Sequence, residues 1–277
     1  MYLLYCDETN MEEKSGDFLV YAGISIPPET AQQLSVDIEQ ARAQRKVPAD
    51  FHLKFNPGPK NLDHGEFIGL KEEILRKAAE HGVRLFAYVV LHDIAKNKGT
   101  DEARRNGINT VLYHFDCYLN RKKDQGIVLL DRFNDKGNKI DTHTREKFSI
   151  GLVGLPYSKE KRLGNILGVH YSTIGQSQFC SLVDIVVGSL RFAINAHTRN
   201  LTDHHATAGA LLELLSPLFF REDRELEGSN KVSELGFQFS PKAISVAKYR
   251  AKYEALQTFL AERRVDTQQR ITDQAFY

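Results

Sequence analysis

Short apolar runs that alternate with helical patterns are the feature that most constrains the fold of this 277-residue chain. Runs at 2–7 and 17–26 flank a polar stretch containing Ser15-Gly16, and together they predict a hairpin of two strands. Further apolar runs predict strands at 83–91, 126–131 and 165–171. Since the later strands alternate with helices, we expect an α/β fold with a mixed sheet covered by helices on its faces.

Apolar residues recur at helical spacing between and after these runs. They predict helices near 31–41, 67–78, 108–119, 141–152, 177–195, 206–216 and 242–264. The segment 47–62 is rich in proline and reads as a loop, with a short strand expected around Phe51–Phe55. We therefore expect an α/β domain over 1–200 and a helical C-terminal extension over 201–277 that packs on it.

Composition excludes several classes of protein. The content of 42% hydrophobic and 26% charged residues is that of a globular chain, which rules out disordered, collagen-like and coiled-coil classes. Lys and Arg number 37 against 36 for Asp and Glu, so a strongly basic nucleic-acid coat is excluded, although a local basic groove is not.

Location is predicted from three further observations. The three cysteines are too few and too scattered for a disulfide framework or a structural zinc site, which suits a reducing compartment. The first residues lack the basic region of a signal peptide. No uninterrupted apolar run reaches the roughly 18–20 residues of a membrane helix. We therefore expect a cytoplasmic protein that does not bind membranes.

The candidate chemistry lies in carboxylates that end or interrupt apolar segments. Asp7 follows the run YLLYC and Asp131 follows GIVLL, so each lies at the end of a predicted strand, next to the cleft at the edge of the sheet. Asp184 interrupts the most apolar predicted helix, and Glu8 is a weaker fourth candidate. Carboxylates that meet in a cleft repel one another, and the hard cations Mg²⁺ or Mn²⁺ relieve that repulsion.

Each carboxylate also has a purely structural interpretation. Asp7 suits the start of a turn, and Asp131 is followed by Arg132, with which it can pair. Asp184 can be a buried acid bonded to backbone or to a basic side chain. The set is more informative than any one member.

The loop around position 50 offers three more polar residues. Asp50, His52 and Lys54 share a face if this segment is extended. In that case Asp50 completes a metal site, His52 shuttles a proton or supports a ligand, and Lys54 contacts phosphate. The alternative is a polar surface loop. Nearby basic residues either track a phosphate backbone or form a solvated face.

Common motifs of other enzyme classes are missing. The sequence has no P-loop, no GxGxxG after a strand, no HExxH and no GxSxG elbow. These absences argue against P-loop NTPases, Rossmann dehydrogenases, zincin proteases and α/β-hydrolases.

Four segments occur in an order that resembles a known family. They are LLYCDETN, DFHLKF, GIVLLDRFND and CSLVDIVVG, and they span about residues 1–195. In this order they look like the prokaryotic family called domain-of-unknown-function 3800, which is regarded as ribonuclease H-like. Thr9-Asn10, Asp50 and Ser181 depart from the family's usual residues. The resemblance implies a ribonuclease H-like fold and an acidic site at Asp7, Asp50, Asp131 and Asp184, with Glu8 and His52 nearby.

These observations lead to a functional expectation and its alternatives. The leading one is a metal-dependent nuclease that cleaves phosphodiester bonds of DNA or RNA with carboxylate-held Mg²⁺ or Mn²⁺. The alternative is a non-catalytic module on the same scaffold that binds nucleic acid or protein. A phosphohydrolase of small esters ranks last, because Thr9 occupies the position where an aspartyl-phosphate enzyme would need a second acid. The final helix suits either a homodimer or partner contact, or a cap on the core.

Overall fold

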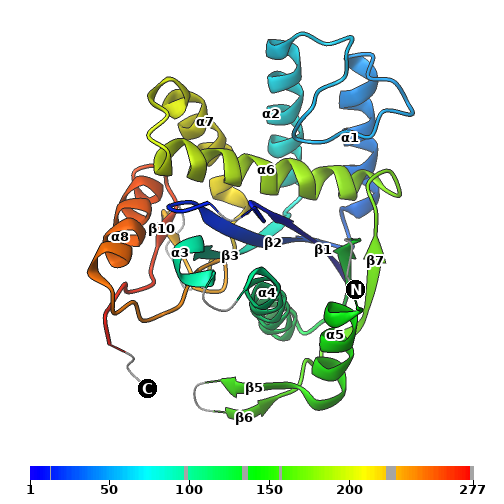
Figure 1. Ribbon diagram of the computed structural model, residues 1–277. Coiled ribbons are helices and arrows are strands. Elements are labelled where there is room, and N and C mark those ends of the chain that lie inside the picture. Colours follow the sequence, from blue (N-terminus) through cyan, green and yellow to red (C-terminus); the bar gives the residue numbers. More distant parts are fainter. Residues whose placement is uncertain (13, 97–98, 133–136, 156–157, 223–228, 275–277) are drawn as a thin grey trace.

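A mixed sheet forms the centre of the computed structural model, which describes residues 1–12, 14–96, 99–132, 137–155, 158–222 and 229–274. In these ranges the sheet has six strands in the order β7-β4-β1-β2-β3-β9 (Figure 1). The strands are β1 (Tyr2–Thr9), β2 (Phe18–Ile26), β3 (Arg84–Leu91), β4 (Gly126–Asp131), β7 (Ile166–Ser172) and β9 (Phe237–Ser240). The five strands predicted from long apolar runs are thus present, and the α/β class with helices on both faces is confirmed.

Strand direction places the N-terminal hairpin at the centre of the sheet. β1, β2 and β3 are antiparallel neighbours. β4 joins the other side of β1 in parallel, and β7 joins β4 in parallel. Since parallel neighbours need a crossover connection, helices lie between β3, β4 and β7 in the chain. The ends of β1 and β4 therefore come to the same edge of the sheet.

Helices cover the sheet on both faces. α6 runs across one face, with α1, α2 and α7 beyond it, and α4 lies against the other face (Figure 1). The helices are α1 (Ala31–Gln44), α2 (His64–Glu80), α3 (His92–Ala95), α4 (Thr100–Lys122), α5 (Lys139–Ile150), α6 (Gln178–Thr198), α7 (His205–Leu215) and α8 (Ala247–Ala261), with 3₁₀ turns η1 (Thr202–His204) and η2 (Ser216–Leu218). All seven predicted helices have counterparts among them.

Alternation along β1 separates two hydrophobic cores. Tyr5 belongs to the core under α6, whereas Leu4 and Cys6 belong to the core under α4. Because successive side chains of a strand point to opposite faces, Asp7 falls on the α6 side and Glu8 on the α4 side. This alternation sets the direction of both acidic residues.

α6 is the most apolar helix of the fold. By length and composition alone it is sufficient to cross a membrane, and it is the one such helix found in the ranges given above. Most of its side chains are instead buried in the α6-side core, where the helix packs on β1, β2 and α7. Asp184 is the only acidic residue along its length.

The C-terminal part is not purely helical, which corrects the expectation for 201–277. β9 (Phe237–Ser240) adds to the main sheet parallel to β3, and β8 (Lys231–Val232) pairs with β10 (Asp266–Thr267). Phe237 and Phe239 are buried and alternate with less buried residues, which is strand periodicity over only four residues. The predicted boundary at 200/201 therefore does not separate the extension from the sheet.

Two further segments differ from the sequence prediction. Phe51–Phe55, expected as a short strand, has no regular secondary structure. The backbone amide of Phe51 donates to the carbonyl of Pro48 over 3.0 Å, which turns the chain before it can extend. β5 (Leu152–Leu155) and β6 (Ser158–Lys161) form a small antiparallel hairpin apart from the main sheet (Figure 1), which the sequence did not predict.

Candidate functional site

Asp7 and Asp131 lie on adjacent parallel strands. Cys6 of β1 is in register with Leu130 of β4, and the two aspartates are the next residues on each strand. Leu129 contacts the α6-side core, so alternation places Asp131 on the same face of the sheet as Asp7. The prediction that the two acids meet at one edge is confirmed at the level of the strands.

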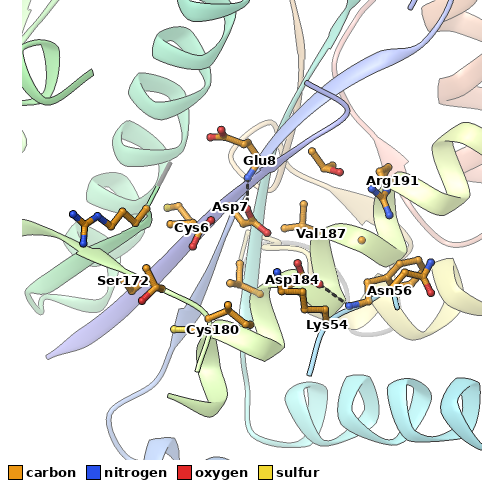
Figure 2. A pocket seen from close by; sticks show the side chains of 18 residues that line it. Cys6, Asp7, Glu8, Lys54, Asn56, Ser172, Cys180, Asp184, Val187 and Arg191 are labelled. Atoms are coloured by element: carbon orange, nitrogen blue, oxygen red, sulfur yellow. Dashed lines mark hydrogen bonds between the residues drawn. The ribbon is translucent and has the colours of Figure 1, made fainter. Parts of the chain in front are cut away.

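Asp184 approaches the same place from α6. Asp7, Asp131 and Asp184 all line one cavity of about 350 Å³, together with residues of the segments 54–56 and 172–174. Figure 2 shows the side chains of Asp7 and Asp184 directed toward each other across this space. We call this space the acidic cavity.

The carboxylates of the acidic cavity disfavour each other's charged forms. Burial, followed by the charges of Asp184 and Asp131, raises the pKa of Asp7 to about 8. A 2.7 Å hydrogen bond donated by the amide of Glu8 to Asp7 opposes this rise only in part. Burial also raises the pKa of Asp131, against a backbone hydrogen bond from Arg132 and the charge of Lys54. This mutual repulsion is the electrostatic state that a bound cation relieves.

The peptide of Phe55 holds Asp184 in place. The amide nitrogen of Phe55 donates to Oδ2 of Asp184 over 2.6 Å. On the other side, Nζ of the buried Lys71 donates to the carbonyl of Phe55 over 3.3 Å and lies 4.2 Å from the centre of its ring. The segment that carries Lys54 is thus fixed between α2 and α6.

Basic side chains border the acidic cavity. Lys54, Arg132 and Arg191 line it, and the Arg191 guanidinium lies 5.8 Å from the centre of the Phe55 ring. Sequence analysis identified Lys54 but missed Arg191. The signal was present, because Arg191 follows Asp184 by seven residues, which is two helical turns on the same face. Phosphate oxygens are the ligands that such a rim attracts.

Glu8 borders the acidic cavity, but its carboxylate is engaged elsewhere. Oε1 of Glu8 lies 2.7 Å from the guanidinium of Arg104 on α4. Figure 2 shows the Glu8 side chain directed away from Asp7 and Asp184. The structure therefore does not bring Glu8, a predicted metal ligand, to the other carboxylates, because alternation along β1 turns it to the opposite face.

Asp50 and His52 lie outside the acidic cavity. Both are exposed and line a neighbouring cavity, whereas Lys54 alone of the predicted trio reaches the acidic cavity. The expected common face required an extended segment, and the turn at 48–51 removes it. Asp50 therefore does not join Asp7, Asp131 and Asp184 as predicted.

The donor chemistry of the acidic cavity fits a hard divalent cation. Its acids offer carboxylate oxygens, which Mg²⁺ and Mn²⁺ prefer. Within the described ranges, however, no three His, Cys, Asp or Glu side chains are grouped closely enough to hold a metal ion as they stand. The three aspartates would therefore have to draw together around an ion.

Gly188 allows Phe55 to reach Asp184, and this predicts a mutational effect. A Cβ atom at Gly188 would lie 2.4 Å from Cβ of Phe55, so Gly188→Ala forces the loop away from α6. Overpacking of this kind costs about 1–3 kcal/mol, which exceeds the gain of up to about 1 kcal/mol from better helix propensity. We expect a net loss of about 1–2 kcal/mol in the free energy of unfolding, measured by urea denaturation.

The matched control is Gly164→Ala, since no atom lies within 4 Å of a Cβ built at Gly164. This variant should unfold within about 0.5 kcal/mol of the wild type. Equal stabilities of the two glycine variants would show that the loop does not depend on close contact with α6.

Comparison with known proteins gives no independent assignment. A scan of the chain against protein-family models finds no match, and a search of curated proteins finds no similar sequence. The resemblance to the domain-of-unknown-function 3800 family therefore stays a prediction that rests on the four motifs.

Proposed function

We propose that this protein is a metal-dependent nuclease with a ribonuclease H-like fold. The observation that carries the proposal is the acidic cavity, where Asp7, Asp131 and Asp184 come together from β1, β4 and α6. The raised pKa of Asp7 supports it, because neighbouring carboxylates contribute to that rise. The strand order supports the fold, since an antiparallel β1-β2-β3 unit is extended by parallel β4 and β7.

Asp7, Asp131 and Asp184 would hold Mg²⁺ or Mn²⁺ in this proposal. When bound, such ions supply an activated water and stabilise charge on the phosphate and leaving oxygen. The chain provides the orientation of the ligands. β1, which continues past the predicted end at Asp7 to Thr9, fixes Asp7, the end of β4 fixes Asp131, and the Phe55 amide fixes Asp184.

Lys54 and Arg191 would bind the substrate. Both line the acidic cavity beside the carboxylates, so they can contact the non-bridging oxygens of a phosphodiester placed there. The opening is bordered by cations in a protein of net charge +1, which concentrates positive charge where the phosphate must sit. Asp50 and His52 are not part of this proposed catalytic group, because they line the other cavity.

The test is incubation of the full chain with single- and double-stranded DNA and RNA, with Mn²⁺ or with a chelator. We expect cleavage of at least one substrate class with Mn²⁺ and none with the chelator. Metal-independent cleavage would contradict the proposed role of the carboxylates. Salt-sensitive binding without cleavage of any substrate would instead favour the non-catalytic module.

A further inference from the structure

A second cavity lies beside the acidic cavity at the N-terminal end of α6. It has a volume of about 430 Å³ and is lined by parts of the same two loops, at 49–52 and 175–177. The acidic cavity is lined by adjacent parts of the same loops: residues 54–56, which follow 49–52, and residues 172–174, which precede 175–177. The two cavities are therefore neighbours along α6, and we call the second one the α6 N-terminal cavity.

The end of α6 presents hydrogen-bond donors to this cavity. The N-cap residue Ser177 makes no capping hydrogen bond through its side chain. The backbone amides of Gln178 and Phe179 have no acceptor within the described part of the chain. Because first-turn amides point out of a helix along its axis, this end of a 21-residue helix attracts an anion.

The side chain of Ser181 is a second, independent indication of a ligand. Ser181 lines the α6 N-terminal cavity and is only 2% exposed. Its hydroxyl forms no hydrogen bond with any described residue, and its oxygen is not one of the fully enclosed unpartnered atoms, so it is open to the cavity. A ligand oxygen in the cavity would supply that partner.

Positive charge completes the donor set. Arg42 lines the cavity and donates to three neutral oxygens, those of Phe51 at 2.7 Å, Pro48 at 3.4 Å and Gln178 at 3.4 Å. The His52 ring lies against Gly175, where an added Cβ would be 2.8 Å from Nε2 of His52. Asp50 also lines the cavity, but its exposed side chain is screened by solvent.

We infer that the α6 N-terminal cavity binds a phosphate group of the nucleic-acid strand that is cut at the acidic cavity. This inference rests on the proposed nuclease function and adds a binding site to it. Backbone amides, a guanidinium and a hydroxyl are the donors that recognise a phosphate. Ser181 precedes Asp184 by three residues, a rise of about 4.5 Å along the helix, so one strand can reach both cavities.

Gln178→Glu tests the site by adding a negative charge without changing the shape of the side chain. Acidic residues are tolerated in the first turn of a helix, so the variant should fold. The matched control is Gln32→Glu, which adds the same charge at an exposed position in the first turn of α1. Neither glutamine is part of the acidic cavity.

Binding of a fluorescent single-stranded oligonucleotide is measured by anisotropy in chelator, so that no cleavage occurs. We expect Gln178→Glu to weaken binding about 10-fold or more, and to reduce the slope of log K against log salt by about one, while Gln32→Glu binds like the wild type. Equal affinities of the two variants would overturn the inference. Ser181→Ala, which removes only the hydroxyl, should weaken binding about 3- to 10-fold.

A titration with inorganic phosphate distinguishes binding of a phosphate within a nucleic-acid strand from binding of free phosphate. If phosphate raises the melting temperature of the wild type but not of Gln178→Glu, while both bind the oligonucleotide equally, the cavity takes free phosphate and the strand assignment is wrong. Cleavage assays separate this site from the proposed function. If the wild type cleaves no substrate but Gln178→Glu still binds the oligonucleotide more weakly than the wild type, the phosphate site is supported and only the nuclease function is contradicted.

Discussion

Asp7→Asn is expected to reduce Mn²⁺-dependent cleavage by on the order of 10³-fold or more, because it removes a carboxylate at the centre of the acidic cavity. Asparagine keeps the shape of the side chain and can still accept the hydrogen bond from the amide of Glu8. The loss would therefore reflect charge and metal binding, not misfolding. The measurement is the rate of cleavage of the substrate class that the wild type accepts.

Asp50→Asn is the matched control for this prediction. It makes the same chemical change in an aspartate that lines the α6 N-terminal cavity and not the acidic cavity. It should cleave at a rate within a few-fold of the wild type. A comparable loss in both variants would show that Asp50 joins the metal site, as the sequence predicted and the structure does not support.

Thermal unfolding at increasing Mn²⁺ concentration compares metal binding by the wild type and the two variants without a substrate. Mn²⁺ at about 100 times its dissociation constant should stabilise the wild type by about 2.7 kcal/mol, because it binds the folded chain only. Asp7→Asn should lose most of this stabilisation, and Asp50→Asn should keep it. An equal melting-temperature shift in all three proteins would place the ion outside the acidic cavity.

The second large effect is a pH-dependent gain in stability from Asp7→Asn in the absence of metal. The folded protein holds the Asp7 proton up to a pKa of about 8, whereas the unfolded chain releases it near the ordinary value of 3.8. Between these values the native state binds more protons, so its free energy of unfolding falls as pH rises from about 4 to 8. The contribution is fully present below pH 4 and is lost as pH passes through about 8.

Asparagine cannot ionise, so the free energy of unfolding of the variant does not fall with pH in this way. A pKa difference of that size corresponds to at most about 5–6 kcal/mol, and the partial exposure of Asp7 reduces this value. We expect Asp7→Asn to be more stable than the wild type by about 2–4 kcal/mol at pH 8.5, and nearly equal at pH 4. Urea denaturation in chelator at both pH values measures the difference.

Asp50→Asn again serves as the comparison, since Asp50 is exposed. Its stability relative to the wild type should change little between pH 4 and 8.5. If the advantage of Asp7→Asn over the wild type were also independent of pH, Asp7 would ionise in the folded protein as an ordinary aspartate. The repulsion within the acidic cavity would then be too weak to favour metal binding.

The sequence predicted the central elements because their patterns are local. The run YLLYC is apolar and short, which suits a strand, whereas the apolar segment around Asp184 is long enough for a buried helix. Asp7 and Asp131 could be placed together because the ends of parallel strands meet at one edge. β9 was missed because its two buried phenylalanines give too short a pattern to separate a strand from a helix.

The remaining features depended on contacts between distant segments. Strand alternation makes Glu8 face α4, but the sequence could not show that Arg104 of α4 lies within ion-pair distance of it. The turn at Pro48 moved Asp50 and His52 into a different cavity from Lys54. The sequence by itself determined which segments are buried and where their carboxylates stand, because periodicity and burial are properties of a short stretch. Only the tertiary structure decided which of those carboxylates share a cavity, because that depends on how strands, α6 and irregular loops pack together.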